Sequence, residues 1–314
     1  MDRKMNPYRA GLGLALIACT LLCLGCSDLL LDEMERLANE TNRPEILPAA
    51  GSIIPSHEVF TLKFPKSMSG ATISVSGGIG SATTQAETST YVDDRLVVSP
   101  ASFWTTGSSQ TLRVTVAEGG ETASYDYTYT VFDGVCVATT GSDTSTGKGT
   151  VRAPYATIQK GIAQAKLLHP SSASEVHVAA GTYTIATTTA KGGYDLGVVL
   201  ENEVSLLGGY ALDWSSRDPV ANVAAVTDGR AKDASQILVC IGASSGVTSA
   251  TVLEGFTVTA SSADASSSAI ALLSSDLTVR GNVVNLGGNS VTAGMNRAGI
   301  ALTADGSSTT EFSP

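Results

Sequence analysis

The stretch GSDTSTGKGTVRAPYATIQKGIAQAK (residues 141–166), with SEVHVAAGTYTI (174–185) after it, decides how this chain folds. A loop rich in glycine, serine and threonine leads into a segment with helical apolar spacing over residues 156–168. Four apolar residues of this helix fall near one face: Ile158, Ile162, Ala165 and Leu168. Thr157 can cap the helix, although a start at Pro154 fits equally well. The pattern predicts a helix that covers the apolar end of a stack of strands.

The same residues resemble the opening coil of right-handed parallel β-helices of the pectate-lyase-like kind. In that family an apolar strand ends in a Pro-Gly or Ala-Gly turn before Thr-Tyr, and VHVAAGTY (176–183) has this order. The resemblance implies that residues 134–314 form a parallel β-helix with a short amino-terminal capping helix. Because this family includes polysaccharide lyases and glycoside hydrolases, it also implies that catalysis has to be considered.

Internal similarity supports stacked coils. Residues 253–259 (LEGFTVT) align with 279–285 (VRGNVVN), and 268–272 (SAIAL) align with 298–302 (AGIAL). Residues 204–210 (VSLLGGY) are an earlier and looser copy. Repeats of this length with a glycine corner are typical of coils that stack on one another. The longer spacing that follows, with DWSSRDPVAN (213–222), predicts a loop or an extra coil. We expect the β-helix to be incomplete at residue 314.

The preceding region, residues 52–133, has short apolar alternations between turns, which predicts six or seven strands in a β-sandwich. The segment PSHEVFTLKFPKSMSGATISVSG (55–77) resembles the bacterial Ig-like modules of surface proteins, and this resemblance implies a spacer role. The predicted core residues are Phe60, Leu62, Phe64, Leu96, Val98, Leu112, Val114 and Val116. The predicted fold is therefore all-β, with an Ig-like β-sandwich followed by a right-handed parallel β-helix.

The first residues have the order of an export signal. A basic start, MDRKMNPYR, precedes an apolar run over residues 11–24, which is shorter than the roughly 20 residues that cross a bilayer. Gly25-Cys26 after this run resembles the lipobox of bacterial lipoproteins, which implies that residues 1–25 are removed and that Cys26 carries the lipid. Cys19 is the alternative lipidation site, and an ordinary secretory signal is a third reading. We interpret residues 26–51 as a tether.

Charge and cysteine content limit the partners. The formal net charge of −10 repels phosphate backbones, so we expect no nucleic acid partner. Beyond the signal, Cys136 and Cys240 remain beside Cys26, which is too few for a disulfide framework. These two cysteines either pair or lie buried separately as small apolar side chains.

The residues that a lyase or hydrolase would use do not form a recognisable set. The candidate acids are Asp143, Asp195, Asp213, Asp218, Asp228, Glu254 and Asp276, and the candidate bases are Arg217, Arg230, Arg280 and Arg297. None repeats at one coil period with a second carboxylate, as a calcium site or a hydrolytic pair would require. We therefore predict no catalytic residue, no cofactor and no metal site.

Several single residues have a structural and a functional interpretation. Asp143 either binds calcium or accepts hydrogen bonds from the loop amides of 144–149, and we favour the second role. Trp214 is expected to cover an ion pair between Arg217 and Asp218. The three histidines, His57, His169 and His177, lack metal spacing and are expected to face solvent or bond locally. Gly192-Gly193 and Gly208-Gly209 lack the context of a phosphate-binding loop.

Together these features predict a bacterial lipoprotein of the cell envelope, held at the outer membrane or cell surface by an N-terminal lipid. Its expected role is binding or structural, with an extracellular glycan or a protein, such as a host surface, as partner. The alternative is a carbohydrate-active enzyme, a polysaccharide lyase or glycoside hydrolase, whose catalytic coils are missing or not recognisable. The sequence leaves the oligomeric state open.

Overall fold

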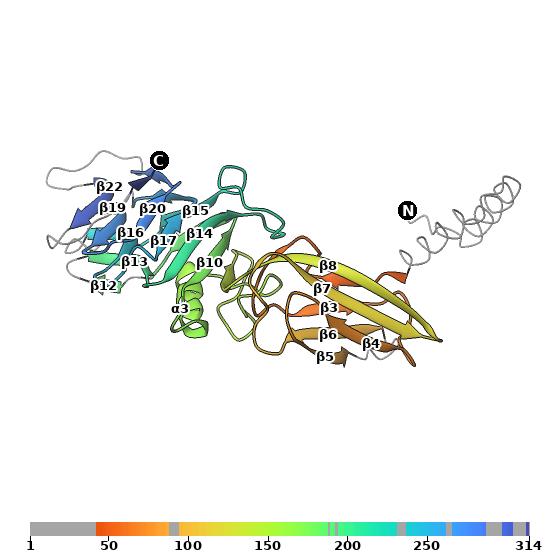
Figure 1. Ribbon diagram of the computed structural model, residues 1–314. Coiled ribbons are helices and arrows are strands. Elements are labelled where there is room, and N and C mark those ends of the chain that lie inside the picture. The colour runs from red at the N-terminus through yellow and green to blue at the C-terminus, as the bar shows by residue number, and fades with distance from the viewer. Residues whose placement is uncertain are drawn as a thin grey trace, which may run out of the picture.

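The computed structural model is all-β, with several sheets (Figure 1). It describes residues 42–87, 94–187, 189–191, 194–230, 237–261, 266–286, 297–303 and 312–313. The predicted signal peptide, most of the predicted tether, and both Cys19 and Cys26 lie outside these ranges. No helix in the described portion has the length and apolar character needed to cross a membrane.

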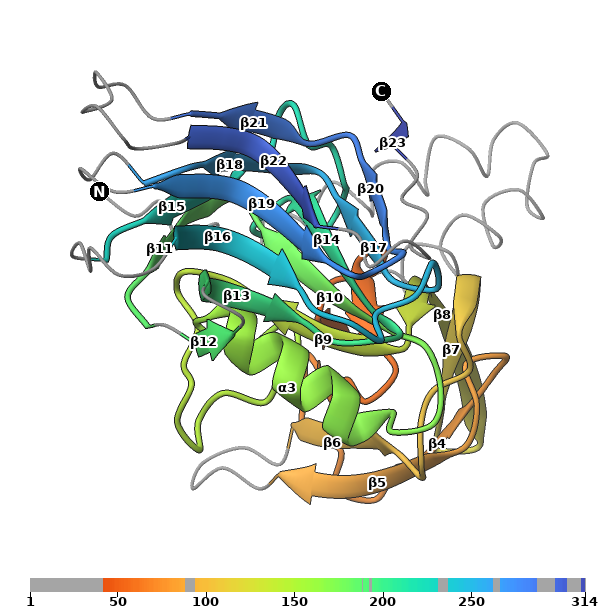
Figure 2. The same ribbon diagram turned by 90° about the vertical axis from the view of Figure 1, so that its left-hand side faces the viewer.

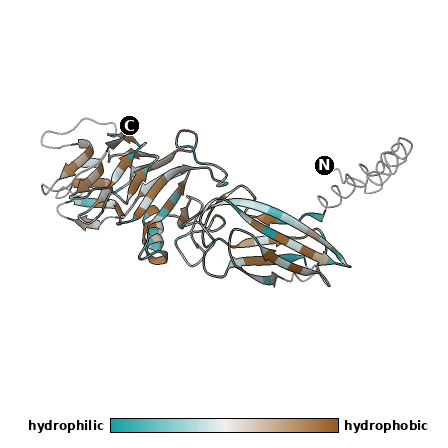
Figure 3. Ribbon diagram, viewed as in Figure 1, coloured by the Kyte–Doolittle hydropathy of each residue, from teal (hydrophilic) through white to brown (hydrophobic). Residues whose placement is uncertain are grey.

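Two four-stranded sheets enclose the core of the amino-terminal half. The antiparallel one has the order β1 (Glu45–Leu47), β3 (Phe60–Lys63), β6 (Arg95–Pro100) and β5 (Ala82–Glu87). The other has the order β2 (Ile53–Pro55), β8 (Glu121–Phe132), β7 (Gly107–Glu118) and β4 (Thr72–Ser76), with β2 parallel to β8. Apolar residues alternate along these strands (Figure 3). Seven of the eight predicted core residues are buried, and Val116 packs against the core while partly buried.

The amino-terminal half begins earlier than the sequence predicts. β1 lies within the predicted tether of residues 26–51, yet it pairs with β3. Two buried tyrosines of β8 fasten this segment, because Tyr127 donates its hydroxyl to the carbonyl oxygen of Pro44 at 2.6 Å and Tyr129 donates to Pro48 at 3.0 Å. A polar, proline-containing segment is thus held by tyrosines far along the chain, a contact that no local pattern indicates.

Three sheets of mainly parallel strands make up the carboxy-terminal half (Figure 2). Sheet 1 contains β9 (Gly134–Val137), β10 (Ser174–Ala179), β14 (Val204–Tyr210), β17 (Val252–Glu254), β20 (Thr278–Arg280) and β23 (Phe312–Ser313). Sheet 2 contains β11 (Gly181–Ile185), β15 (Ala224–Asp228), β18 (Phe256–Thr259) and β21 (Val283–Asn285). Sheet 3 contains β12 (Thr189–Lys191), β13 (Tyr194–Leu200), β16 (Ile237–Ala243), β19 (Ser267–Leu273) and β22 (Arg297–Thr303), with β12 antiparallel to β13. From β10 onward the chain visits the three sheets in turn.

The register of these strands matches the repeats in the sequence. Leu253 pairs with Val279 and Ile270 pairs with Ile300, as the alignments predict. The longer spacing near residues 210–250 is accounted for by a loop after β14 within a single circuit of β14, β15 and β16. At the corner after β17, Gly255 adopts a φ of +82°, and its carbonyl oxygen would lie 2.5 Å from a Cβ at Gly208. A side chain at either glycine would therefore separate adjacent coils.

Helix α3 (Ile158–Leu168) covers the β9 end of the stack, as predicted (Figures 1 and 2). Thr157 is the N-cap, and its side chain accepts a hydrogen bond from the amide of Lys160 at 3.2 Å. The buried residues of α3 are Ile158, Gly161, Ile162 and Ala165, and Leu168 packs partly buried against the same core. A Cβ at Gly161 would lie 2.5 Å from a methyl group of Val137, so the glycine lets the helix approach β9.

Candidate functional site

Charged side chains form a ladder on sheet 1, across β17 and β20. Arg217, from the loop after β14, donates from Nη1 to Glu254 at 2.8 Å and from Nε to the carbonyl oxygen of Gly208 at 2.9 Å. Arg280 donates from Nε to the second carboxylate oxygen of Glu254 at 2.7 Å. Glu254 and Arg280 are neighbours because they are register partners. The ladder places two guanidinium groups on one carboxylate.

This ladder holds its carboxylate in the charged form. Partial burial alone would raise the pKa of Glu254, but the hydrogen bonds from Arg280 and Arg217 outweigh burial and lower it below its ordinary value. A general acid near neutral pH needs the opposite shift. Glu254 is therefore suited to holding the two arginines rather than to giving up a proton.

A second ion pair is buried at the end of β15. The side chains of Arg230 and Asp228 are 3% and 0% exposed, and Arg230 Nη2 lies 2.7 Å from Asp228 Oδ2. Arg230 also donates to the carbonyl oxygens of Asp195 and Val239, both at 2.8 Å. These carbonyls belong to β13 and β16, whose pairing skips Gly197. The pair thus satisfies two backbone carbonyl groups of sheet 3, which is a structural role.

Asp143 anchors the capping helix. Its Oδ1 accepts hydrogen bonds from the amides of Ala156 at 2.8 Å and Thr157 at 3.1 Å, and its Oδ2 accepts from the Thr157 hydroxyl at 2.6 Å. The favoured interpretation placed these bonds on the amides of 144–149, so the partners were wrong. The carboxylate instead reaches across to the start of α3, where the first amides lack helical partners.

The acidic side chains of the loop after β14 accept hydrogen bonds from groups of the same loop. Asp213 accepts hydrogen bonds from the hydroxyl and the amide of Ser215, which lower its pKa, and Asp218 accepts from two amides of its own loop. The predicted ion pair between Arg217 and Asp218 is therefore wrong, since Arg217 pairs with Glu254. Trp214 is 2% exposed, and this burial excludes a sugar-stacking platform there.

The structure brings two groups of the predicted candidates together and scatters the rest. Arg217, Glu254 and Arg280 form one group, and Asp228 with Arg230 forms the other. Asp195 is buried on β13, and Asp276 lies in the turn before β20. The side chain of Arg297 lies outside the described residues.

An aromatic stack joins the two halves of the chain. Phe132 at the end of β8 stacks on His177 of β10 with ring centroids 3.5 Å apart, and His177 stacks on Tyr210 of β14 at 4.1 Å. His177 is 3% exposed, and its Nε2 lies 2.6 Å from Glu175 and 3.0 Å from the Tyr210 hydroxyl. Burial lowers the pKa of His177 despite the adjacent Glu175. His177 does not face solvent, because Phe132 covers it, but its bond to Glu175, two residues away, is the local bond that was the alternative expectation.

The other two histidines lie near the same junction. His57 Nε2 is 3.1 Å from the carbonyl oxygen of Lys148, and burial lowers the pKa of His57. His169 is 6% exposed, with its ring centroid 5.2 Å from that of Phe103. The bond of His57 is therefore to a residue 91 positions away rather than a local one, and His169 is buried rather than facing solvent.

Glu58 is a buried carboxylate at this junction that the sequence analysis did not single out. It is 1% exposed, and Oε2 accepts a hydrogen bond from the amide of Val151 at 2.7 Å. The indole of Trp104 donates to the Glu58 carbonyl oxygen at 2.8 Å. Burial raises the pKa of Glu58 to about 7. A signal was present, because the alternation that buries Phe60 and Leu62 also places Glu58 on the inner face.

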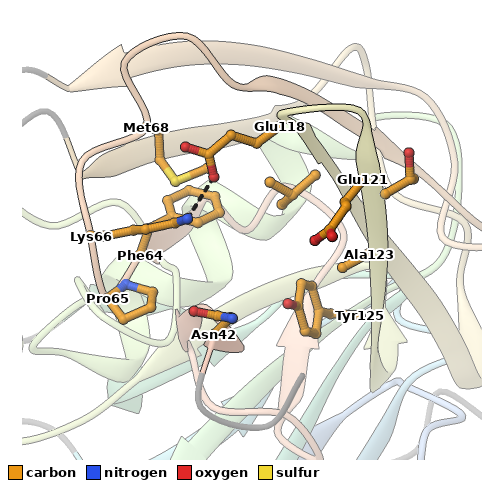
Figure 4. Close-up of a pocket in the computed structure, with 11 residues that line it drawn as sticks. Asn42, Phe64, Pro65, Lys66, Met68, Glu118, Glu121, Ala123 and Tyr125 are labelled. Atoms are coloured by element: carbon orange, nitrogen blue, oxygen red, sulfur yellow. Dashed lines mark ion pairs between the residues drawn. The ribbon is translucent and has the colours of Figure 1, made fainter. Parts of the chain in front are cut away.

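Several cavities open on the described surface, among them two large ones. One, of about 530 Å³, lies at the end of the amino-terminal half. Figure 4 shows its apolar floor of Phe64 and Met68, with the pair of Lys66 and Glu118 on one side and Glu121 across from it. Lys66 Nζ lies 2.6 Å from Glu118 Oε2, but both side chains are more than a third exposed, so the pair adds little rigidity.

The second cavity, of about 660 Å³, lies between the start of α3 and strand β11. Its floor is apolar, formed by Ile158, Ile185, Val198 and Val226, and threonines stand at its rim. Among the predicted candidate acids and bases, only Asp143 lines it, and that carboxylate is engaged by α3.

Cys136 and Cys240 are both buried and free, so they do not pair. Within the described ranges, no cluster of three histidine, cysteine or acidic residues could hold a metal ion. Gly192-Gly193 lies outside those ranges. Searches against protein-family models, curated proteins and solved structures returned no match for this chain.

Proposed function

We propose that this chain is an exported bacterial lipoprotein, anchored through Cys26, with a binding or structural role at the cell surface. In this proposal the amino-terminal half is an Ig-like β-sandwich that serves as a spacer. The carboxy-terminal half is a right-handed parallel β-helix that contacts an extracellular glycan or protein.

The strand order supports the fold part of the proposal. Strands β10, β11 and β13 are followed by β14, β15 and β16, each pairing in parallel with its counterpart one circuit earlier. Crossovers between parallel strands are right-handed in about 98% of cases, which gives the hand of the winding. Helix α3 at the first coil agrees with the resemblance to pectate-lyase-like proteins.

One observation carries the functional part. The charged groups that a β-helix enzyme would present are instead bonded to other groups of the fold: Glu254 holds two arginines, Arg230 holds Asp228 and two carbonyls, and Asp143 holds α3. Such groups are not available to move protons or to bind calcium. This arrangement favours recognition by shape over catalysis.

The junction between the halves agrees with a presenting role. The Ile53 amide donates to the Trp214 carbonyl oxygen at 2.8 Å, and Arg152 donates to the Thr61 hydroxyl at 2.7 Å. With the Phe132–His177 stack and the Glu58–Val151 bond, these contacts attach the two halves along several elements. A spacer that is fixed to the unit it carries would hold that unit at a defined distance from the membrane.

The anchor is tested by metabolic labelling with an alkyne analogue of palmitate in a bacterial host. We expect label on the wild-type chain and on Cys19→Ser, and none on Cys26→Ser. Label that persists on Cys26→Ser would refute the proposed anchor.

The binding role is tested with a glycan array and with pectate and alginate as lyase substrates, each with added calcium. We expect no unsaturated product. A product that disappears in Glu254→Gln would replace the proposal with the enzymatic alternative.

A further inference from the structure

Strand β11 has a free edge. In the order β11-β15-β18-β21 it is the terminal strand, and within the described part of the chain no strand pairs with its other side. Figure 2 shows β11 as the last strand of its layer on the side of α3. Sheet 1 continues one strand further at this end, with β9, and sheet 3 with β12. Sheet 2 is therefore one strand shorter than its neighbours here.

The backbone groups on this edge can be identified. The Gly181 amide donates toward the β15 side, and the Ile185 carbonyl oxygen accepts from that side. Because successive residues of a strand direct their amide and carbonyl groups to opposite edges, Thr182 and Thr184 of β11 direct theirs to the free edge. This edge carries donors and acceptors at the spacing of a second strand.

The free edge faces the 660 Å³ cavity. The four β11 residues 182–185 all line that cavity, and residues 186 and 187, which follow the strand, line it as well. Alternate side chains of a strand point to opposite faces, so an unbroken run of lining residues means that the cavity meets the strand edge-on. The cavity is thus bordered by backbone along one wall.

Two polar side chains of the opposite wall, Gln159 and Asp143, are already bonded. Gln159 accepts from the Val199 amide at 2.7 Å and donates to the Val199 carbonyl oxygen at 3.4 Å. Asp143 is held by Thr157 and by the first amides of α3. The remaining surface of that wall is mostly apolar, with Ile158 and Val198, apart from Lys160, whose Nζ lies 5.8 Å from the ring centroid of Tyr155. A ligand in the cavity would therefore meet the backbone groups of the β11 edge on one wall and the ammonium group of Lys160 on the other.

We propose that this cavity binds an extended polypeptide segment, which adds to β11 as a further parallel strand. Residues beside Tyr183 and Ile185 would enter the apolar floor, and residues beside Thr182 and Thr184 would face outward, so the ligand alternates apolar and hydroxyl side chains. The proposal names the ligand class for the binding role proposed above and rests on that role.

The probe is a fluorescein-labelled peptide with the sequence of residues 254–260, EGFTVTA. This sequence contains β18, which already adds in parallel to sheet 2 with Phe256 and Val258 inward. We expect saturable binding to the full chain, measured by fluorescence anisotropy. On binding, hydrogen-exchange mass spectrometry should show slower exchange in the segment 181–187.

Two substitutions at one position separate backbone from side-chain recognition. Thr184→Pro removes the edge amide while leaving the side that pairs with β15, since proline is tolerated on strand edges. Thr184→Pro should weaken the affinity for the peptide by about tenfold or more, because one hydrogen bond is lost and the proline ring adds steric bulk at the edge. Thr184→Val keeps the amide and should bind as the wild type does. If Thr184→Pro does not fold, the exchange pattern of the wild type decides.

The proposal is overturned if the peptide does not bind, if both variants lose it equally, or if protection appears away from 181–187. A dimer of the full chain that Thr184→Pro dissociates, with no peptide bound, would assign the edge to a second copy instead. Loss of palmitate label would refute the anchor and leave this site untouched, so the two failures are distinguishable.

Discussion

Replacing Glu58 with glutamine should stabilise the protein at alkaline pH and not at acid pH. The carboxylate lies at the junction of the two halves, 1% exposed, where it accepts from the amides of Val151 at 2.7 Å and Val59 at 3.3 Å. Burial is the main cause of its raised pKa, and the two amides together with Arg152 only partly oppose it. The charged form is therefore the costly one.

The sign and size follow from linkage. The folded pKa of Glu58 is about 7 and the unfolded value is 4.5, so the folded state holds the proton more tightly. Its contribution to stability is complete below the unfolded pKa and is lost as the pH rises through the folded pKa. Between about pH 5 and pH 8 this loss amounts to about 2.5 kcal/mol. Glutamine carries no charge at either pH and avoids the loss, although its amide leaves one hydrogen bond imperfect.

The assay is urea unfolding of the wild type and Glu58→Gln at both pH values. The free energy of unfolding of the variant, relative to the wild type, should rise by about 2.5 kcal/mol from pH 5 to pH 8. His57 also titrates in this range, and its effect cancels because the variant and the wild type are compared at the same pH. Glu121→Gln, an exposed residue of the same half, should change stability by less than about 0.5 kcal/mol at either pH. An equal effect of Glu58→Gln at both pH values would refute the reasoning.

Three further outcomes are expected. Ile162→Ala should lower the free energy of unfolding by about 2–5 kcal/mol, because it opens a cavity under helix α3. In the same urea titration Leu167→Ala should have little effect, because Leu167 is 70% exposed. Glu254→Gln should lower the free energy of unfolding by about 1 kcal/mol, and this loss should shrink in high salt because the ladder is partly exposed. Equal losses at low and high salt would argue against an electrostatic cause. Cys136 and Cys240 are buried with raised pKa values, so peptide mass spectrometry should find both thiols unmodified by a maleimide until the protein is unfolded.

Much of the carboxy-terminal half could be predicted because its signals are local and repeated. The alignment of residues 253–259 with 279–285 gave the pairing of β17 with β20 and of β18 with β21. The helical face of Ile158, Ile162 and Ala165 gave the capping helix. Both patterns depend on spacing along the chain, which recurs each time the chain passes through the three sheets.

Contacts between distant segments could not be predicted in this way. The free edge of β11 depends on where the neighbouring sheets begin, which no feature of GTYTI indicates. The charge ladder depends on a loop that returns Arg217 to Glu254, and the sequence suggested Asp218 as its partner because that residue is adjacent. Adjacency in sequence is thus a poor predictor of ion-pair partners in loops, where the backbone has no regular conformation that fixes which side chains meet.

The junction is one of the places where the alternation rule fails; in sheet 3, β16 and β19 are likewise buried at six of seven positions. Far from the amino-terminal half, β17 and β20 each bury only their central residue, as a strand with one wet face should. By contrast β9 is buried at all four positions, and β10 at five of six. Continuous apolar runs are typical of strands covered on both faces; VCV (135–137) is such a run, and VHVA (176–179) is one apart from His177. Two-faced burial at the first two coils therefore follows from docking on the amino-terminal half, and His177 is buried because its strand lies inside that interface.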